Sequence, residues 1–523
     1  MGPPPVKLRS KPALSNQPPN SPVRPPLSPA TPPNQAAALL QSFRGEQRVP
    51  VPIHPKERAL IIVAVIHLSF LPWAIGTRDV WSQFTILGFA LVSFVLSLLP
   101  RQYENEYSPE GPFRINPILR LIRFPVFWIG LVFVGYVLTQ ALNPAWTRMT
   151  DGSAWWLQSR DHITWLPTSV EAPVGKMNAW RMLSVYASIW LLGCALWTGL
   201  SRRTAVMSVL GALVFNGTVL AILGILQQVS HTSKILWFIK VPVAHPVATF
   251  VYENHGGAYF NLITFVAVGL MAWHMIRSQR RLVRSSPAPV YAIAAIITGM
   301  LVCVSNSRAA LILLLVYVVV GTVLFGLWRI YGGEKEGNRT VSIIVAVVSF
   351  AFMGLGATYL NLGKNLTELG TLFNPATSEY IDFRISARNA TMDLFKDKPM
   401  TGWGAGSFRH AFTEKQQHYP NIFRSGKDHV LFWDHAHNDY AQALAELGII
   451  GFALPLCALG WLVWRLCRLG GLSQPAYILI VLGLGLIMAH SWMDFPLYNP
   501  AILTTFCAVW ILTVRWSELE TTR

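Results

Sequence analysis

Two histidines, an asparagine and two aspartates crowd the start of an apolar helix in residues 434–451, which read DHAHNDYAQALAELGIIG. The pattern predicts that this helix begins near His437, which places His437 and Asn438 at its N-terminus. A helix N-terminus has free N–H groups and a partial positive charge, and both suit a phosphate. A histidine there can also take up a proton near neutral pH. The segment therefore predicts proton transfer beside a bound phosphate.

The same residues allow a purely structural interpretation. In it, Asn438 or Asp439 is the helix N-cap and His437 is an interfacial side chain. A polar stripe favours a functional site, because Asp439, Gln442 and Glu446 follow one another at i, i+3 and i+7. Gln442 and Glu446 lie deep in the apolar helix, where polar groups are costly unless they face a cavity or partners. From the sequence, both interpretations stay open.

The composition of the whole chain indicates a membrane protein. Of its 523 residues, 52% are hydrophobic and 13% are charged, whereas an average soluble protein has about 25% charged residues. Apolar runs of about 20 residues, the length that crosses a bilayer as a helix, recur along the chain. The formal net charge is +17, but the basic residues lie largely in short segments between apolar runs. We therefore expect no nucleic-acid partner, and no spacing indicates a metal site.

Twelve membrane spans are predicted, and they form an all-α bundle because only helices satisfy their own backbone hydrogen bonds in lipid. The spans fall near residues 58–76, 80–99, 121–141, 180–200, 204–226, 256–276, 288–305, 309–329, 341–360, 437–464, 475–491 and 497–515. Together they make residues 58–523 a polytopic membrane domain. Residues 1–57 hold 15 of the 35 prolines, a composition that cannot bury a core, so we expect a disordered tail.

The distribution of basic residues predicts the topology. Connections that follow even-numbered spans are rich in Lys and Arg, and so are both ends of the chain. The positive-inside rule then places both termini in the cytoplasm. Three segments are expected outside the cytoplasm, namely 142–179, 227–255 and 361–436. The last is the longest, and its composition suggests a folded cap.

Five pieces of sequence, in order from about residue 180 to the C-terminus, resemble the O-antigen ligase and O-antigen polymerase family. One is HN followed after nine residues by GIIG, beginning at His437. The others are TFVYENHGGAYF at 249–260, SNSRAALI at 305–312, RISARNATMDLFKDKPMTGWGAGSF at 384–408 and HSWMDFPLYNPA at 490–501. Any one piece is weak evidence, whereas five in order are fairly specific.

The resemblance implies a bundle similar to the GT-C membrane glycosyltransferases. It also implies a reaction at the outer face of the bacterial inner membrane, within lipopolysaccharide biosynthesis. A glycan leaves an undecaprenyl-diphosphate carrier when an acceptor hydroxyl attacks its anomeric carbon with inversion. The acceptor is lipid A-core or another surface glycan. The implied enzyme uses no metal, no nucleotide and no other cofactor, and its partners are the donor, the acceptor and membrane lipid.

The resemblance also implies roles for two residues. His437 matches the motif histidine thought to be the general base or the group that positions the acceptor. Arg308 matches a family arginine, and its guanidinium could hold the diphosphate by two hydrogen bonds. The alternative for Arg308 is an interfacial arginine whose side chain extends to water.

One departure from the family concerns the positive side chain that would bind the diphosphate of the donor. Where many members have Arg-x-x-Gly-Thr-Phe, this chain has His245-Pro-Val-Ala-Thr-Phe. A histidine is a weaker and pH-dependent phosphate ligand. Either His245 substitutes for the arginine, or Lys240, Arg384 or Arg388 supplies the positive charge.

Further candidates for substrate binding gather at the same face of the membrane. Asn254 and His255 could orient a sugar or phosphate, although a packing role is equally open. Asp494 lies in the last outside turn, where DFPLYNP can also be a simple proline-punctuated turn. The full set of expected binding residues is His245, Asn254, His255, Arg384, Arg388, His435, Asn438, Asp439 and Asp494.

Two alternatives to a ligase remain. A polymerase or a protein O-oligosaccharyltransferase would share the class and differ in the acceptor, and the motifs do not separate these. A polysaccharide-lipid transporter or flippase would often show an internal repeat or charges at the membrane midplane. The polar residues here gather at one face, which favours interfacial chemistry.

Overall fold

The computed structural model describes Gly2 and residues 52–104, 112–243, 246–281, 285–331, 379–425 and 429–521. Residues Met1–Val51 form a separate unit from Pro52–Arg523, and most of the expected tail lies outside the described residues. The first described helix begins at Pro55, slightly before the predicted boundary.

Eleven of the predicted spans correspond to helices in the described part of the chain. They are α2 (Pro55–Trp73), α3 (Val80–Leu98), α5 (Pro125–Leu142), α6 (Ala179–Gly199), α7 (Arg203–Val229), α8 (Glu253–Arg281), α9 (Ala288–Val304), α10 (Arg308–Tyr331), α16 (Asp439–Arg468), α17 (Pro475–Met493) and α18 (Pro500–Thr521). Among the described residues, nine helices are long and apolar enough to cross a membrane. The prediction of an all-α membrane protein is confirmed. The count of twelve stays a prediction, because the span 341–360 lies outside the described residues.

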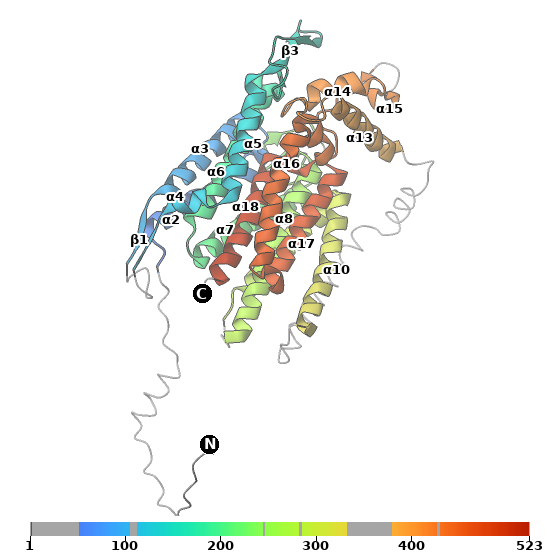
Figure 1. Cartoon of the computed structure of the whole chain (residues 1–523). Helices are drawn as coiled ribbons and strands as arrows, with labels where there is room; N and C mark the ends of the chain where they lie inside the picture. The colour runs from blue at the N-terminus through green and yellow to red at the C-terminus, as the bar shows by residue number, and fades with distance from the viewer. Residues whose placement is uncertain are drawn as a thin grey trace, which may run out of the picture. The chain divides into compact units, whose positions relative to one another are not determined.

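The helices differ in how much of their surface they bury. Most residues of α6, α8 and α18 are buried, whereas only a minority of the residues of α5 and α16 are. The central helices supply the large buried side chains Tyr259, Phe265 and Trp516 to one core. Figure 1 shows α8, α16, α17 and α18 running side by side in this bundle. The exposed apolar faces of the outer helices are the surfaces that lipid would cover.

Short strands occur in the connections between helices. In the expected outside segment 142–179, β3 (Pro144–Thr150) pairs antiparallel with β4 (Trp155–Ser159) and parallel with β5 (Ser169–Glu171). Two-stranded pairs form between β1 (Arg101–Tyr103) and β2 (Phe113–Ile115), and between β6 (Lys234–Ile235) and β7 (Ile239–Lys240). The sequence interpretation did not predict these strands.

The long segment before α16 contains a folded cap. Its elements are α13 (Glu379–Asp397), α14 (Phe408–Gln416), α15 (Pro420–Phe423), β8 (Arg424–Ser425) and β9 (His429–Val430). They share a small core of their own, built around Leu394, Trp403, Phe408 and Phe412. Figure 1 shows α13, α14 and α15 at the same end of the bundle as β3 and the start of α16.

A close backbone contact joins the cap to α16. Gly402 and Gly448 both have positive φ, and a Cβ on either would lie 2.4 Å from a carbonyl oxygen of the other segment. Trp403 N donates to Ala445 O at 2.9 Å and Gly404 N donates to Glu446 O at 2.8 Å. The GWGAG sequence therefore forms a turn that only glycine permits at these positions.

The topology prediction can be tested with single cysteines in a chain whose five native cysteines are replaced. Asp161→Cys and Asn421→Cys lie at exposed positions in two segments expected outside the cytoplasm. We expect both to react with a membrane-impermeant maleimide added to intact spheroplasts. Ser285→Cys, exposed between α8 and α9, should react only after permeabilisation. The reverse pattern would show that the topology is wrong.

Candidate functional site

A buried carboxylate, Asp494, receives hydrogen bonds from several elements. It follows the last residue of α17 and its side chain is fully buried. Oδ2 accepts from the Tyr252 hydroxyl at 2.9 Å and from the Asn254 amide. Oδ1 accepts from the Phe495 N–H at 3.0 Å and lies 3.1 Å from His437 Nδ1. Segments that precede α8 and α16 and that follow α17 thus meet at one carboxylate.

The electrostatics favour an ionised Asp494. Burial raises the pKa of Asp494, but the hydrogen bond and charge of His437, followed by the charge of Arg384, outweigh burial and hold the pKa well below its usual range. An ionised carboxylate beside Nδ1 favours the tautomer with the proton on Nδ1. In the neutral form of His437, the Nε2 lone pair is then available to accept a proton.

The backbone of His437 is held in an uncommon conformation. Its φ is +51°, in the left-handed region that non-glycine residues seldom adopt. The next residue, Asn438, is the N-cap of α16: its Oδ1 accepts from Ala441 N at 3.0 Å and its Nδ2 donates to Trp492 O at 2.9 Å. The Asp439 carboxylate accepts from Leu497 N at 2.8 Å. Asn438 and Asp439 therefore fix the backbone around His437 to the end of α17.

One arginine, Arg384, contacts this centre, and the other two predicted arginines stand on α13 and α10. Arg384 Nη2 on α13 lies 3.9 Å from Asp494 Oδ2, and its Nη1 donates to Met493 O at 3.0 Å. Arg388 follows one turn later on the same helix and is half-buried. Arg308 is the first residue of α10 and is exposed. Its neighbour Ser307 donates to Asn254 Oδ1 at 2.6 Å, which links the start of α10 to the Asp494 network.

Phe495 places three of the predicted histidines around one ring. His435 stacks on it with ring centroids 4.3 Å apart, and His437 and His255 meet it edge-on at 4.9 Å each. His255 Nε2 also lies 3.2 Å from Phe495 O. The fourth predicted histidine, His245, lies outside the described residues. The structure thus brings His437, Asp494, Asn254 and Arg384 into direct contact, and places His255 and His435 one ring away.

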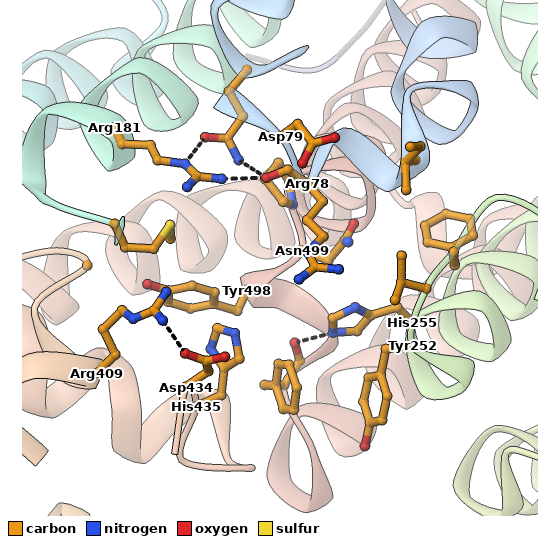
Figure 2. A pocket seen from close by; sticks show the side chains of 18 of the residues that line it. Arg78, Asp79, Arg181, Tyr252, His255, Arg409, Asp434, His435, Tyr498 and Asn499 are labelled. Carbon is orange, nitrogen blue, oxygen red and sulfur yellow. Dashed lines mark hydrogen bonds and ion pairs between the residues drawn. The ribbon is translucent and has the colours of Figure 1, made fainter. Parts of the chain in front are cut away.

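A pocket of about 420 Å³, here called the head-group pocket, lies beside His435 and Phe495. Figure 2 shows Arg78, Arg181 and Arg409 around it, from three different parts of the chain. Arg409 pairs with Asp434 at 2.7 Å. Arg181 donates through Nε to Gln83 at 2.7 Å and through Nη2 to Arg78 O. A pocket with three guanidinium groups suits an anionic ligand such as a phosphate.

The sequence interpretation missed these three arginines. Arg181 carried a usable signal, because it stands inside the predicted span 180–200 and charged residues within spans are usually functional. Arg78 and Arg409 stand in polar connections, where a single arginine carries no signal of its own. Their proximity depends on the tertiary fold.

A second cavity connects with the head-group pocket. It is a groove of about 300 Å³ between α5, α6, α16 and α18, lined almost entirely by apolar side chains, and is here called the lipid groove. Met182 and Tyr498 line both cavities. The arginine-lined head-group pocket and the apolar lipid groove thus share two side chains, an arrangement that fits an amphiphilic ligand.

The contact between the cap and α16 positions the residues where the head-group pocket and the lipid groove meet. Glu446, on α16 beside the lipid groove, accepts from Gly406 N at 2.9 Å and from Phe408 N at 3.3 Å. Tyr498 donates to the same carboxylate at 3.4 Å. In the part of the chain that the structure describes, no group of three or more His, Cys, Asp or Glu side chains is arranged as a metal site.

Residues 292–456 match the protein family described as O-antigen ligase. The similarity to the O-antigen ligase family thus rests on these residues, about a third of the chain. The resemblance seen in the sequence is confirmed for three of its five pieces, because 249–260 and 490–501 lie outside the matched residues. The O-antigen ligase match includes Arg308, Arg384 and His437, whereas Asp494, Arg78 and Arg181 lie outside the matched residues. No curated protein matches the chain significantly by sequence.

The Asp494 network predicts a stability effect. Asp494→Ala leaves the Tyr252 hydroxyl, the Asn254 amide and the Phe495 N–H without their acceptor. We expect the free energy of unfolding to fall by about 3 kcal/mol, measured by denaturation of the detergent-solubilised protein. Asp161→Ala, at an exposed position, is the control and should unfold like the wild type.

The pH dependence gives a second readout of this prediction. Because folding lowers the pKa of Asp494, its stabilising contribution is present above the unfolded value of about 4 and is lost as pH falls through the folded value. The difference in stability between wild type and Asp494→Asn should therefore shrink in strong acid. An Asp494→Ala protein as stable as wild type would contradict the network.

Proposed function

We propose that this protein transfers a glycan from an undecaprenyl-diphosphate carrier to a hydroxyl of lipid A-core or another surface glycan. The reaction takes place at the outer face of the bacterial inner membrane, with both termini of the chain in the cytoplasm. One observation carries the proposal: the carboxylate-held His437 contacts Phe495, which lines a pocket with three arginines that shares side chains with an apolar groove. The O-antigen ligase match supports transfer of lipid-linked glycans in general.

His437 acts as the general base in this mechanism. The Nε2 lone pair takes the proton of the acceptor hydroxyl as its oxygen attacks the anomeric carbon from the face opposite the carrier. The bond between the anomeric carbon and the diphosphate oxygen breaks, and its electron pair leaves with the diphosphate. Asp494 positions the imidazole through Nδ1 and stabilises the imidazolium that forms. The anomeric configuration inverts in this single displacement.

The arginines neutralise the departing diphosphate. Arg308 is the one whose sequence context matches the family motif, and Ser307 ties its helix end to the same network as His437. Arg384 contributes further positive charge 3.9 Å from Asp494. Fixed positive charge next to a developing anion lowers the barrier to its departure. The mechanism uses neither a metal ion nor a nucleotide.

The cavities accommodate the two ends of the donor. The head-group pocket offers guanidinium groups for phosphate oxygens, and the lipid groove offers apolar helix faces for the isoprenoid chain. Tyr498 lies at their boundary, where its ring contacts His435 and its hydroxyl donates to Glu446. A lipid-linked diphosphate matches this sequence of surfaces, whereas a nucleotide sugar would leave the lipid groove empty.

The first test of the mechanism replaces His437 by Asn, because asparagine tolerates the left-handed backbone that His437 adopts. We expect turnover of a defined lipid-linked glycan to fall about 10²–10⁴-fold with donor binding unchanged. His418→Asn, at an exposed position in the cap, should transfer like the wild type. The measurement is single-turnover transfer in excess chelator, with donor binding assayed separately.

Each outcome of that experiment bears on the mechanism. Near wild-type transfer by His437→Asn would leave His437 without a role in catalysis. Loss of wild-type activity in chelator, restored by magnesium or manganese, would contradict the metal-free reaction. Weaker donor binding in step with slower transfer would assign His437 to binding in place of proton transfer.

The second test concerns Arg308. Arg308→Lys keeps the charge but loses the two-pronged contact with a diphosphate, so we expect transfer to fall about 10–100-fold and donor binding to weaken. Arg329→Lys, in the last turn of the same helix, is the matched control and should behave like the wild type. Equal activity of the two variants would show that Arg308 is an ordinary interfacial arginine.

A further inference from the structure

A third cavity, here called the aromatic groove, lies between the β3–β4 sheet and the cap. It has a volume of about 620 Å³. The sheet contributes three tryptophans, and the cap contributes another tryptophan and two phenylalanines; these residues are Trp146, Trp155, Trp156, Trp403, Phe423 and Phe432. None of them lines the head-group pocket or the lipid groove.

The rings of the groove are arranged in pairs that span its two sides. Trp155 of the sheet meets Phe432 of the cap edge-on with centroids 6.2 Å apart. Trp146 of the sheet faces Trp403 of the cap at 6.5 Å and 30°. Trp156 and Phe432 remain 46% and 47% exposed. Exposed aromatic rings that gather in one concave surface mark a binding site in preference to a folding core.

The groove also offers polar groups. Thr413, Glu414 and Gln416 line it from α14. His410 lines it too and is 1% exposed, with Nε2 3.2 Å from Met177 O and Nδ1 without a hydrogen-bond partner among the described residues. Burial lowers the pKa of His410 to about 4, so its ring is neutral near pH 7. A buried ring nitrogen without a partner is a hydrogen-bond acceptor available to a ligand.

We propose that the aromatic groove binds saccharide rings of a glycan substrate. A pyranose ring presents a face of C–H groups that packs on an aromatic ring, and an edge of hydroxyls that seeks acceptors and donors. The groove provides both surfaces, since aromatic faces alternate with the α14 side chains and with His410. A lipid chain would take the Glu414 carboxylate, whose side chain is 58% exposed, out of water, which is costly.

The groove adjoins the head-group pocket through consecutive residues of α14. Arg409 lines the pocket and His410 lines the groove. Arg409 also lies over the ring of Phe432 at 5.3 Å, while its guanidinium pairs with Asp434. A glycan whose diphosphate occupies the head-group pocket would reach the groove across this residue. The inference therefore rests on the proposed function. It adds a binding site for sugar rings that lie away from the bond between the anomeric carbon and the diphosphate.

The test measures binding of a lipid-free saccharide to the full-length protein in nanodiscs by calorimetry. The probe is the polysaccharide released by mild acid from the lipid carrier of the strain that encodes the chain. We expect saturable binding that weakens about five- to tenfold in Trp156→Ala and in Phe432→Ala. Trp165→Ala removes an equally large ring that is 79% exposed in the same connection and does not line the groove. This control should bind like the wild type.

Two further arms separate this inference from the proposed function. His437→Asn should bind the saccharide normally even when transfer is lost, and normal transfer by that variant would contradict the proposed mechanism alone. Undecaprenyl phosphate without sugar should bind equally well to wild type and Trp156→Ala. Absence of saccharide binding by the wild type, equal loss in Trp165→Ala, or dependence of the sugar-free lipid on Trp156 would each overturn the inference.

Discussion

The arrangement of the site depends on one buried negative charge. Removing the Asp494 carboxylate from water is costly unless donors replace its hydration. Here the donors come from Tyr252, Asn254 and the backbone of Phe495, His437 Nδ1 lies 3.1 Å away, and Arg384 supplies positive charge nearby. These groups belong to segments far apart in the sequence. The cost of burial therefore couples the packing of α8, α13, α16 and α17 to the orientation of one imidazole.

The helices were predictable because each carries its own signal. An apolar run of about 20 residues specifies a span without reference to the rest of the chain, and eleven such runs correspond to helices. The strands β3 and β4 carried no comparable signal, because their tryptophans pair only within a tertiary context. Their sheet was missed although its aromatic residues were conspicuous in the sequence.

The candidate site likewise combines residues that local sequence patterns predicted with contacts that only the fold establishes. His437, Arg308 and Asp494 were singled out from short motifs, and Asn438 from its capping position. The bond between His437 and Asp494 joins residues 57 positions apart, so no local pattern announces it. The arginines of the head-group pocket converge only in three dimensions. Sequence patterns identified the groups able to react, whereas the fold determines which of them meet and what surrounds them.

The break in α16 has a mechanical consequence. Gly448 interrupts the helical backbone, and its contact with Gly402 fixes the preceding turns, which carry Gln442 and Glu446, to the cap. The residues after the break form the exposed apolar part of the helix. A bilayer that changes thickness tilts or bends spans at small cost per ångström. The part of α16 beyond Gly448 can absorb such strain while the contacts with the cap hold the polar turns that precede Gly448 in place.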